Sequence, residues 1–79
     1  MSVVAWLVTT VSGTLLIRRF ETPAQVTCEQ LCKRVKMLLD NDKPFDLFHD
    51  SHMIDSTSKE LVIVSSGTLQ VLKYVRRWS

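Results

Sequence analysis

Hydrophobic and polar residues follow two different periods along this chain, and these periods predict its secondary structure. Residues 3–10 and 15–20 are rich in β-branched and other apolar side chains and flank Gly13, which is typical of a β-hairpin. Over residues 27–40 the apolar positions recur every three or four residues, which predicts an amphipathic helix. Further short apolar runs, typical of extended segments, lie at residues 45–49, 53–54, 61–64 and 68–75. We therefore expect one helix between two groups of strands.

The start of the predicted helix carries a capping signature. The Thr27 hydroxyl can accept a hydrogen bond from the backbone N–H of Gln30, whose side chain can reach back to the backbone of Thr27. Val26 before the cap and Leu31 after it are spaced to pack on each other as a hydrophobic staple. The apolar stripe of the helix consists of Cys28, Leu31, Cys32, Val35, Leu38 and Leu39. We expect this stripe to lie against the sheet, out of contact with water.

Side chains alternate between the two faces of each predicted strand. In the third strand Phe45, Leu47 and His49 share one face, and Asp46 and Phe48 share the other. In the last strand Leu69 and Val71 point one way, and Gln70, Leu72 and Tyr74 point the other way.

The second strand does not alternate cleanly. If Leu16 and Phe20 face the helix, Arg18 faces it too, and burial of an unpaired guanidinium is too costly. We therefore predict a β-bulge near Leu16–Ile17 that turns Ile17 inward and Arg18 outward.

Length and composition limit the classes of function. A chain of 79 residues makes a single domain over residues 1–79, which can be an excised part of a longer protein. With 46% apolar and 23% charged residues and only two glycines, the composition is that of a globular protein. No apolar run approaches the roughly 20 residues of a membrane-spanning helix, and no lysine or arginine precedes the apolar residues 1–11. We expect no membrane insertion, and a cytoplasmic or nuclear location.

Charge is unevenly distributed, although the net charge of +2 is small. Basic residues gather at residues 18–19, 33–36 and 73–77, whereas acidic residues concentrate between residues 40 and 55. Such a separation would orient a charged partner more than it would tighten binding. Trp78 beside two arginines could contact nucleic acid, but one aromatic residue and a weak net charge do not support that interpretation. We expect no nucleic-acid partner.

The sequence contains no evident constellation of catalytic or metal-binding side chains. The two cysteines are four residues apart, which is not the spacing of a redox motif, and zinc would need two further ligands. His49, Asp50 and His52 are too few convergent groups for a metal or a nucleophilic mechanism, so we interpret them as polar turn residues. Residues 40–42 resemble the opening of a calcium loop but lack its spacing and closing glutamate. We therefore expect no enzymatic activity, metal, cofactor or small-molecule substrate.

The order and spacing of these elements resemble the ubiquitin-like β-grasp superfold over nearly the whole chain. Residues 3–20 look like the first hairpin of such a domain, with Gly13 at its turn. Pro23 and Thr27 fall where such domains often place a proline and the helix cap. The segments that look like the third strand and the approach to the last strand are Phe45–Phe48, Ile63 and residues 65–69. The resemblance implies an α+β fold in which a mixed sheet of four or five strands wraps around one main helix, in ββαββ order.

The resemblance also implies a non-catalytic protein-binding module. Ubiquitin-like domains dock partners through an apolar patch with a basic rim on the sheet face turned away from the helix. The matching positions here are Phe48, Gln70, Leu72 and Lys73, with Phe48 and Leu72 as the apolar anchors. A receptor of the ubiquitin pathway is the implied partner. The alternative is that these residues cover the edge of the domain itself or pack against the rest of a longer chain.

Two further features bear on the function that this resemblance implies. Ubiquitin and its conjugated relatives end in Gly-Gly, whereas this sequence ends in residues 75–79 without one, so we do not expect a conjugated modifier unless the sequence is a fragment. Ras-association and Ras-binding domains, a second branch of the superfold, resemble this chain in the helix and the Phe45–Phe48 strand. That branch implies binding of a small GTPase through Arg18, Arg19 and Lys33. A structural domain within a larger protein is a third hypothesis.

Overall fold

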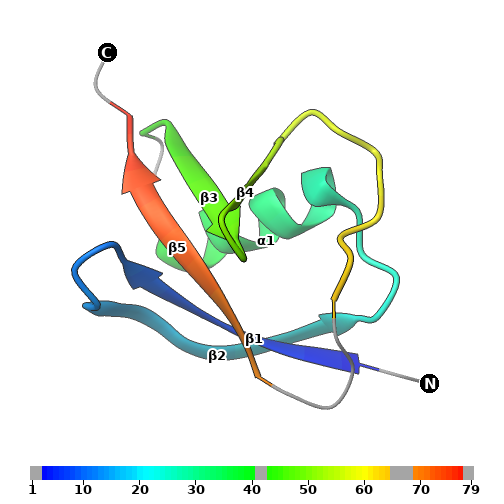
Figure 1. Ribbon diagram of the computed structural model, residues 1–79, viewed down its shortest axis with the longest axis horizontal. Helices are drawn as coiled ribbons and strands as arrows, with labels where there is room; N and C mark the ends of the chain where they lie inside the picture. Colours follow the sequence, from blue (N-terminus) through cyan, green and yellow to red (C-terminus); the bar gives the residue numbers. More distant parts are fainter. Residues whose placement is uncertain (1–2, 41–42, 65–68, 78–79) are drawn as a thin grey trace.

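The computed structural model describes residues 3–40, 43–64 and 69–77, and within them it is a small α+β structure with one helix and a five-stranded mixed sheet (Figure 1). The elements are β1 (Val3–Thr10), β2 (Leu15–Pro23), α1 (Cys28–Leu39), β3 (Phe45–His49), β4 (His52–Ile54) and β5 (Gln70–Arg76). The predicted hairpin, the helix and the strands of residues 45–49, 53–54 and 70–75 are thus confirmed. The apolar run at residues 61–64 forms no strand and makes only an isolated bridge between Leu61 and Thr27. No helix among these residues is long and apolar enough to cross a membrane.

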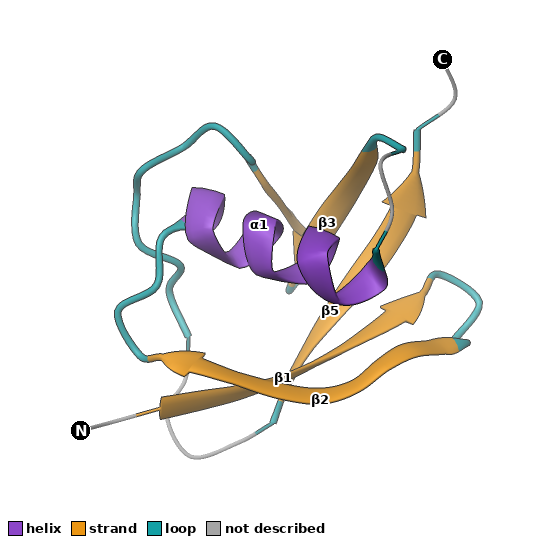
Figure 2. Ribbon diagram, turned by 180° about the vertical axis from the view of Figure 1, so that it is seen from behind, coloured by secondary structure: helices purple, strands orange, loops and turns teal. Residues whose placement is uncertain are grey.

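The strands are arranged in the order β2-β1-β5-β3-β4. The central strands β1 and β5 are parallel, and every other neighbouring pair is antiparallel. The helix lies across one face of this twisted sheet (Figure 2). Along the chain the order is ββαβββ and not ββαββ, because His52–Ile54 pairs with β3 as a separate short strand. Asp50 and Ser51 make the turn of that hairpin with φ angles of 49° and 68°, the left-handed region.

The first turn of α1 is capped as the sequence predicts. The Gln30 backbone N–H donates to the Thr27 hydroxyl, and the Thr27 backbone N–H donates to the Gln30 side-chain oxygen, both at 3.1 Å. Two further N–H groups at this end of the helix bond to the loop after β4. The Cys28 backbone N–H donates to the Glu60 carbonyl oxygen at 2.9 Å, and the Glu29 backbone N–H donates to the Ser58 carbonyl oxygen at 3.0 Å. This loop therefore closes the helix N-terminus.

The core lies between the helix and the inner face of the sheet. Its fully buried side chains are Trp6, Val8, Leu31, Val35, Leu47 and Leu72. The expectation that Leu38 joins this core is wrong, because 46% of its surface is exposed. Leu39, which also belongs to the predicted stripe, does pack against the core, because Leu31, Val35 and Leu39 follow at steps of four residues along one side of the helix.

The predicted irregularity of β2 is confirmed. Register shifts occur on both sides of the pair Val8↔Ile17, so that two arginines lie opposite a single residue of β1. Ile17 packs against the core and Arg18 is exposed. The extra residues turn the guanidinium group out of the core, as a β-bulge does.

Several interpreted positions lie outside the described residues. They are Trp78, Asn41, Asp42 and the expected turn at residues 65–67. The helix end before this gap is described: Asp40 adopts a left-handed conformation with φ 50°, and its backbone N–H donates to the Met37 carbonyl oxygen at 3.2 Å.

Candidate functional site

The inner and outer faces of β5 are the reverse of what we expected. Leu72 is fully buried and only 8% of Gln70 is exposed, so the expectation that both lie on the docking face is wrong. The cause is the parallel register, in which Gln70 lies beside Trp6 and Leu72 beside Val8. Neighbouring residues of paired strands share a face, and both β1 residues belong to the core. Leu72 is therefore a core residue.

Gln70 completes a buried polar pair. Its side-chain oxygen lies 2.8 Å from Nε2 of His49, which is itself buried. The indole of Trp6 meets the His49 ring edge-on, at 5.6 Å between centroids, and donates its own N–H to the Thr22 hydroxyl at 2.8 Å. No buried side-chain nitrogen or oxygen of the described residues lacks a partner. Gln70 and His49 therefore have a structural role in the core.

Both histidines of the β3–β4 hairpin lie close to Asp50. His49 lies 3.7 Å from the Asp50 carboxylate, and Nδ1 of His52 lies 3.0 Å from the Asp50 carbonyl oxygen. Among the residues described, no group of three His, Cys, Asp or Glu side chains could hold a metal ion. We interpret these contacts as those of a hairpin turn.

The outer face of the sheet carries an apolar patch around Phe48 and Lys73. These two residues pair across β3 and β5 and therefore share the outer face. Val71 and Val75 flank Lys73 at two-residue spacing on the same face. Together with Val11 these four residues line a shallow hollow of about 560 Å³. We call these five residues the outer-face patch.

The patch extends across the sheet in both directions. Met53 of β4 pairs with Phe48 and is more than half exposed, and Leu7 of β1 pairs with Val71. At one rim of the hollow lie Asp50 and Ser51. The arrangement is a row of apolar side chains interrupted by one cation, which suits a partner with an apolar ridge and an acidic group.

Of the four residues expected on the docking face, Phe48 and Lys73 lie together on the outer face of the sheet, whereas Gln70 and Leu72 are buried. Val71 and Val75 lie on the outer face where we expected Gln70 and Leu72. The alternation of β5 contained the signal for this, because Lys73 cannot share a face with Leu72, the residue next to it.

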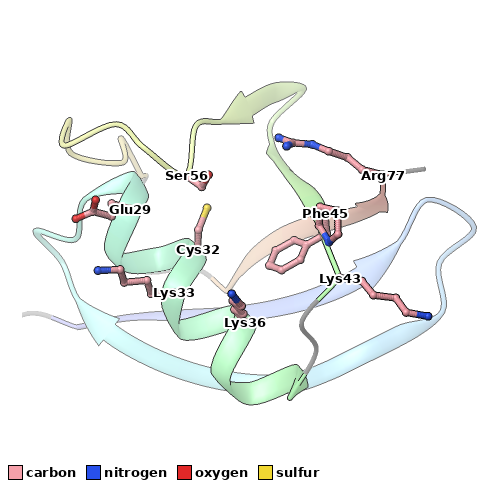
Figure 3. Close-up of a pocket in the computed structure, with 9 residues that line it drawn as sticks. Glu29, Cys32, Lys33, Lys36, Lys43, Phe45, Ser56 and Arg77 are labelled. Carbon is pink, nitrogen blue, oxygen red and sulfur yellow. The ribbon is translucent and has the colours of Figure 1, made fainter. Parts of the chain in front are cut away.

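The three residues of the alternative interface are not on one surface feature. Arg18 and Arg19 are exposed on the edge strand β2, where Arg19 makes a 3.9 Å ion pair with Glu21. Lys33 instead lines a hollow on the helix side (Figure 3). The neighbouring Arg34 lines a different hollow, together with residues at the end of β2. Arg34, not Lys33, is thus on the side of the helix that faces β2.

The Cys32 thiol is buried in the core. Burial is the main cause that raises the pKa of Cys32 from 9.0 to about 11, and the nearby Cys28 and two aspartates raise it further. A thiol with so high a pKa is protonated at neutral pH and is unreactive. Cys32 acts as a small apolar core residue.

Comparison with known proteins gives no family assignment: no protein-family model matches this sequence, and a search of curated proteins finds no significant match.

Proposed function

We propose that this chain is a non-catalytic protein-binding module of the ubiquitin-like β-grasp type, which docks a protein partner through the outer-face patch. The observation that carries the proposal is the position of Phe48, Val71 and Val75 around Lys73 on the sheet face turned away from the helix. The ββα arrangement at the start of the chain and the parallel pairing of β1 with β5 are compatible with a β-grasp.

Apolar exposure supports docking at this face. Val71 has 44% of its surface exposed, although it lies on a central strand of the sheet. Valine on a central strand is typically covered, and contiguous exposed apolar residues mark interaction sites in folded proteins. Phe48 is the largest side chain of the patch and has the character of a central anchor. Lys73 would pair with an acidic residue of the partner.

A receptor of the ubiquitin pathway is the partner class that we propose. The test is capture of partners from cell extract by the wild-type domain, by Phe48→Ala and by Met37→Ala. Met37 is the matched control, because it is 77% exposed on the helix, on the opposite side of the sheet. We expect a partner that binds the wild type and Met37→Ala and that Phe48→Ala loses. Equal capture by all three folded domains would contradict the proposal.

The second candidate is a Ras-association domain, and one observation favours it. Such domains add their second strand to the sheet of a small GTPase, and here β2 is an edge strand with Arg18 and Arg19 exposed. The bulged register of β2 is unfavourable for such pairing, because bulges bend an edge away from a regular ladder. GTP-dependent binding to a small GTPase that Arg18→Glu abolishes would favour this candidate over the first.

A further inference from the structure

A basic hollow lies on the helix side of the molecule, away from the outer-face patch. Its volume is about 360 Å³, which is within the size range of ligand sites. Its basic side chains come from three separate segments of the chain: Lys33 and Lys36 from α1, Lys43 from the segment before β3, and Arg77 from the end of β5. Figure 3 shows Glu29 and Lys33 at one end, and Phe45 and Arg77 at the other. We call this feature the basic hollow.

The fold holds one of these cations in place. The Arg77 guanidinium donates to the Asp46 carboxylate, through Nε at 2.7 Å and also through a terminal nitrogen. The backbone N–H of Arg77 donates to the Pro44 carbonyl oxygen at 3.1 Å, which ties the end of β5 to the start of β3. Lys33 and Lys36 are three residues apart on the helix and therefore project from one side of it. The position of the basic rim is thus set by secondary structure.

The floor of the basic hollow is apolar. Phe45 stacks on Tyr74, with ring centroids 5.1 Å apart, and Cys32 is nearly buried. Figure 3 shows the Cys32 sulfur between the two ends, close to Ser56. An apolar floor below a basic rim can accept an apolar side chain whose neighbours are acidic.

We propose that the basic hollow binds an acidic peptide segment of a protein partner, with carboxylates on the lysines and one apolar side chain on Phe45. Complementary charge supports this occupant, because three lysines line the hollow with Glu29 as the acidic residue among its lining, while Asp46 offsets the charge of Arg77. Because Glu29 lies at one end, the two ends of the rim differ in charge, and this difference would orient the bound segment.

Two other anionic partners fit the basic hollow less well. A single-stranded nucleic acid would need several aromatic faces for successive bases, whereas Phe45 is the one aromatic residue among the described lining of the hollow. A membrane surface is broad and attracts dense basic clusters, whereas this rim surrounds a hollow and includes Glu29. The net charge of the whole chain is only +2.

The test is a titration of the ¹⁵N-labelled domain with a synthetic peptide of glutamates around one leucine. The variant Lys33→Glu/Lys36→Glu should weaken binding about tenfold or more, because two attractive charges become repulsive. The control Arg18→Glu/Arg19→Glu changes the net charge equally on the exposed edge strand β2, away from the basic hollow and from the outer-face patch, and should weaken binding by only about twofold through long-range electrostatics. Glu29→Gln should strengthen binding, and peptide-induced shifts should centre on Phe45.

Three results would overturn this proposal. Equal weakening by both double variants would show that only net charge attracts the peptide. Equal binding of a peptide with serine in place of leucine would remove the role of the apolar floor. Tighter binding of a single-stranded oligonucleotide or of anionic vesicles, lost in Lys33→Glu/Lys36→Glu, would assign the hollow to another class of ligand. Because Phe48 lies on the opposite sheet face, these results are independent of the outer-face patch.

Discussion

At the scale of single residues, the account depends on which of two neighbours in β5 points into the core. Leu72 and Val71 are adjacent and both apolar, so their chemistry alone does not distinguish them. The register with β1 does, because it places Leu72 beside the fully buried Val8 and Val71 beside the half-buried Leu7. A one-residue change of register exchanges core and surface for a whole strand.

Truncation of these two neighbours should destabilise the domain to different extents. Leu72→Ala removes a fully buried side chain and should lower the free energy of unfolding by about 2–5 kcal/mol. Val71→Ala should lower it by less than about 1 kcal/mol, since its side chain is half exposed. Urea denaturation of both variants measures the difference. A greater loss from Val71→Ala would show that the strand faces are assigned in reverse.

The Cys32 thiol predicts a dependence of stability on alkaline pH. Its pKa is about 11 in the folded state and 9.0 in the unfolded chain, so the folded domain holds this proton more tightly than the unfolded chain does. The stabilisation is complete below about pH 9 and is lost as the pH rises towards 11.

The check is the slope of the free energy of unfolding against pH in that interval, for the wild type and for Cys32→Ala. We expect a steeper fall in the wild type, since Cys32→Ala removes this thiol and leaves every other titratable side chain in place. The same slope in both would contradict the burial of this thiol.

At the scale of elements, local signals predict more than long-range pairing. The capping pair Thr27 and Gln30, the period of α1 and the turn at Gly13 involve residues close in sequence, and all were predictable. The short strand His52–Ile54 pairs with β3 directly before it, and its apolar residues were recognised in the sequence, whereas the face of β5 is set by a partner distant in the chain. The bulge in β2 was predictable because a buried Arg18 would be so costly.

The helix cap should contribute measurably to stability. Thr27→Ala removes the side-chain acceptor of the Gln30 backbone N–H and should cost about 1 kcal/mol. Thr27→Ser keeps the acceptor and should cost much less. Gln30→Ala removes the reciprocal bond, and in a double-mutant cycle the two alanine substitutions should not be additive. Additive losses in thermal or urea unfolding would show that the two bonds act independently.

At the scale of the whole molecule, the two faces of the structure have different surface chemistry. The sheet face away from the helix presents Phe48, Val71 and Val75 around Lys73, and the helix side presents the basic hollow. The candidate anchor Phe48 could be predicted from sequence, since strand alternation places it on the other face of the sheet from its neighbour Leu47. The same face could be assigned to Val71 and Val75 from their two-residue spacing from Lys73, whereas the contribution of Val11, which lies outside the strands, could not be predicted.

The most direct test of the proposed docking face is the affinity of the domain for its captured partner, measured by calorimetry with Val71→Asp and Met37→Asp. Both substitutions place a carboxylate on an exposed apolar position, one in the outer-face patch and one on the helix. We expect Val71→Asp to raise Kd by about 30-fold or more, the effect of losing a hot spot of about 2 kcal/mol. Met37→Asp should leave Kd nearly unchanged. Unchanged affinity in a folded Val71→Asp domain would contradict docking through the outer face of the sheet.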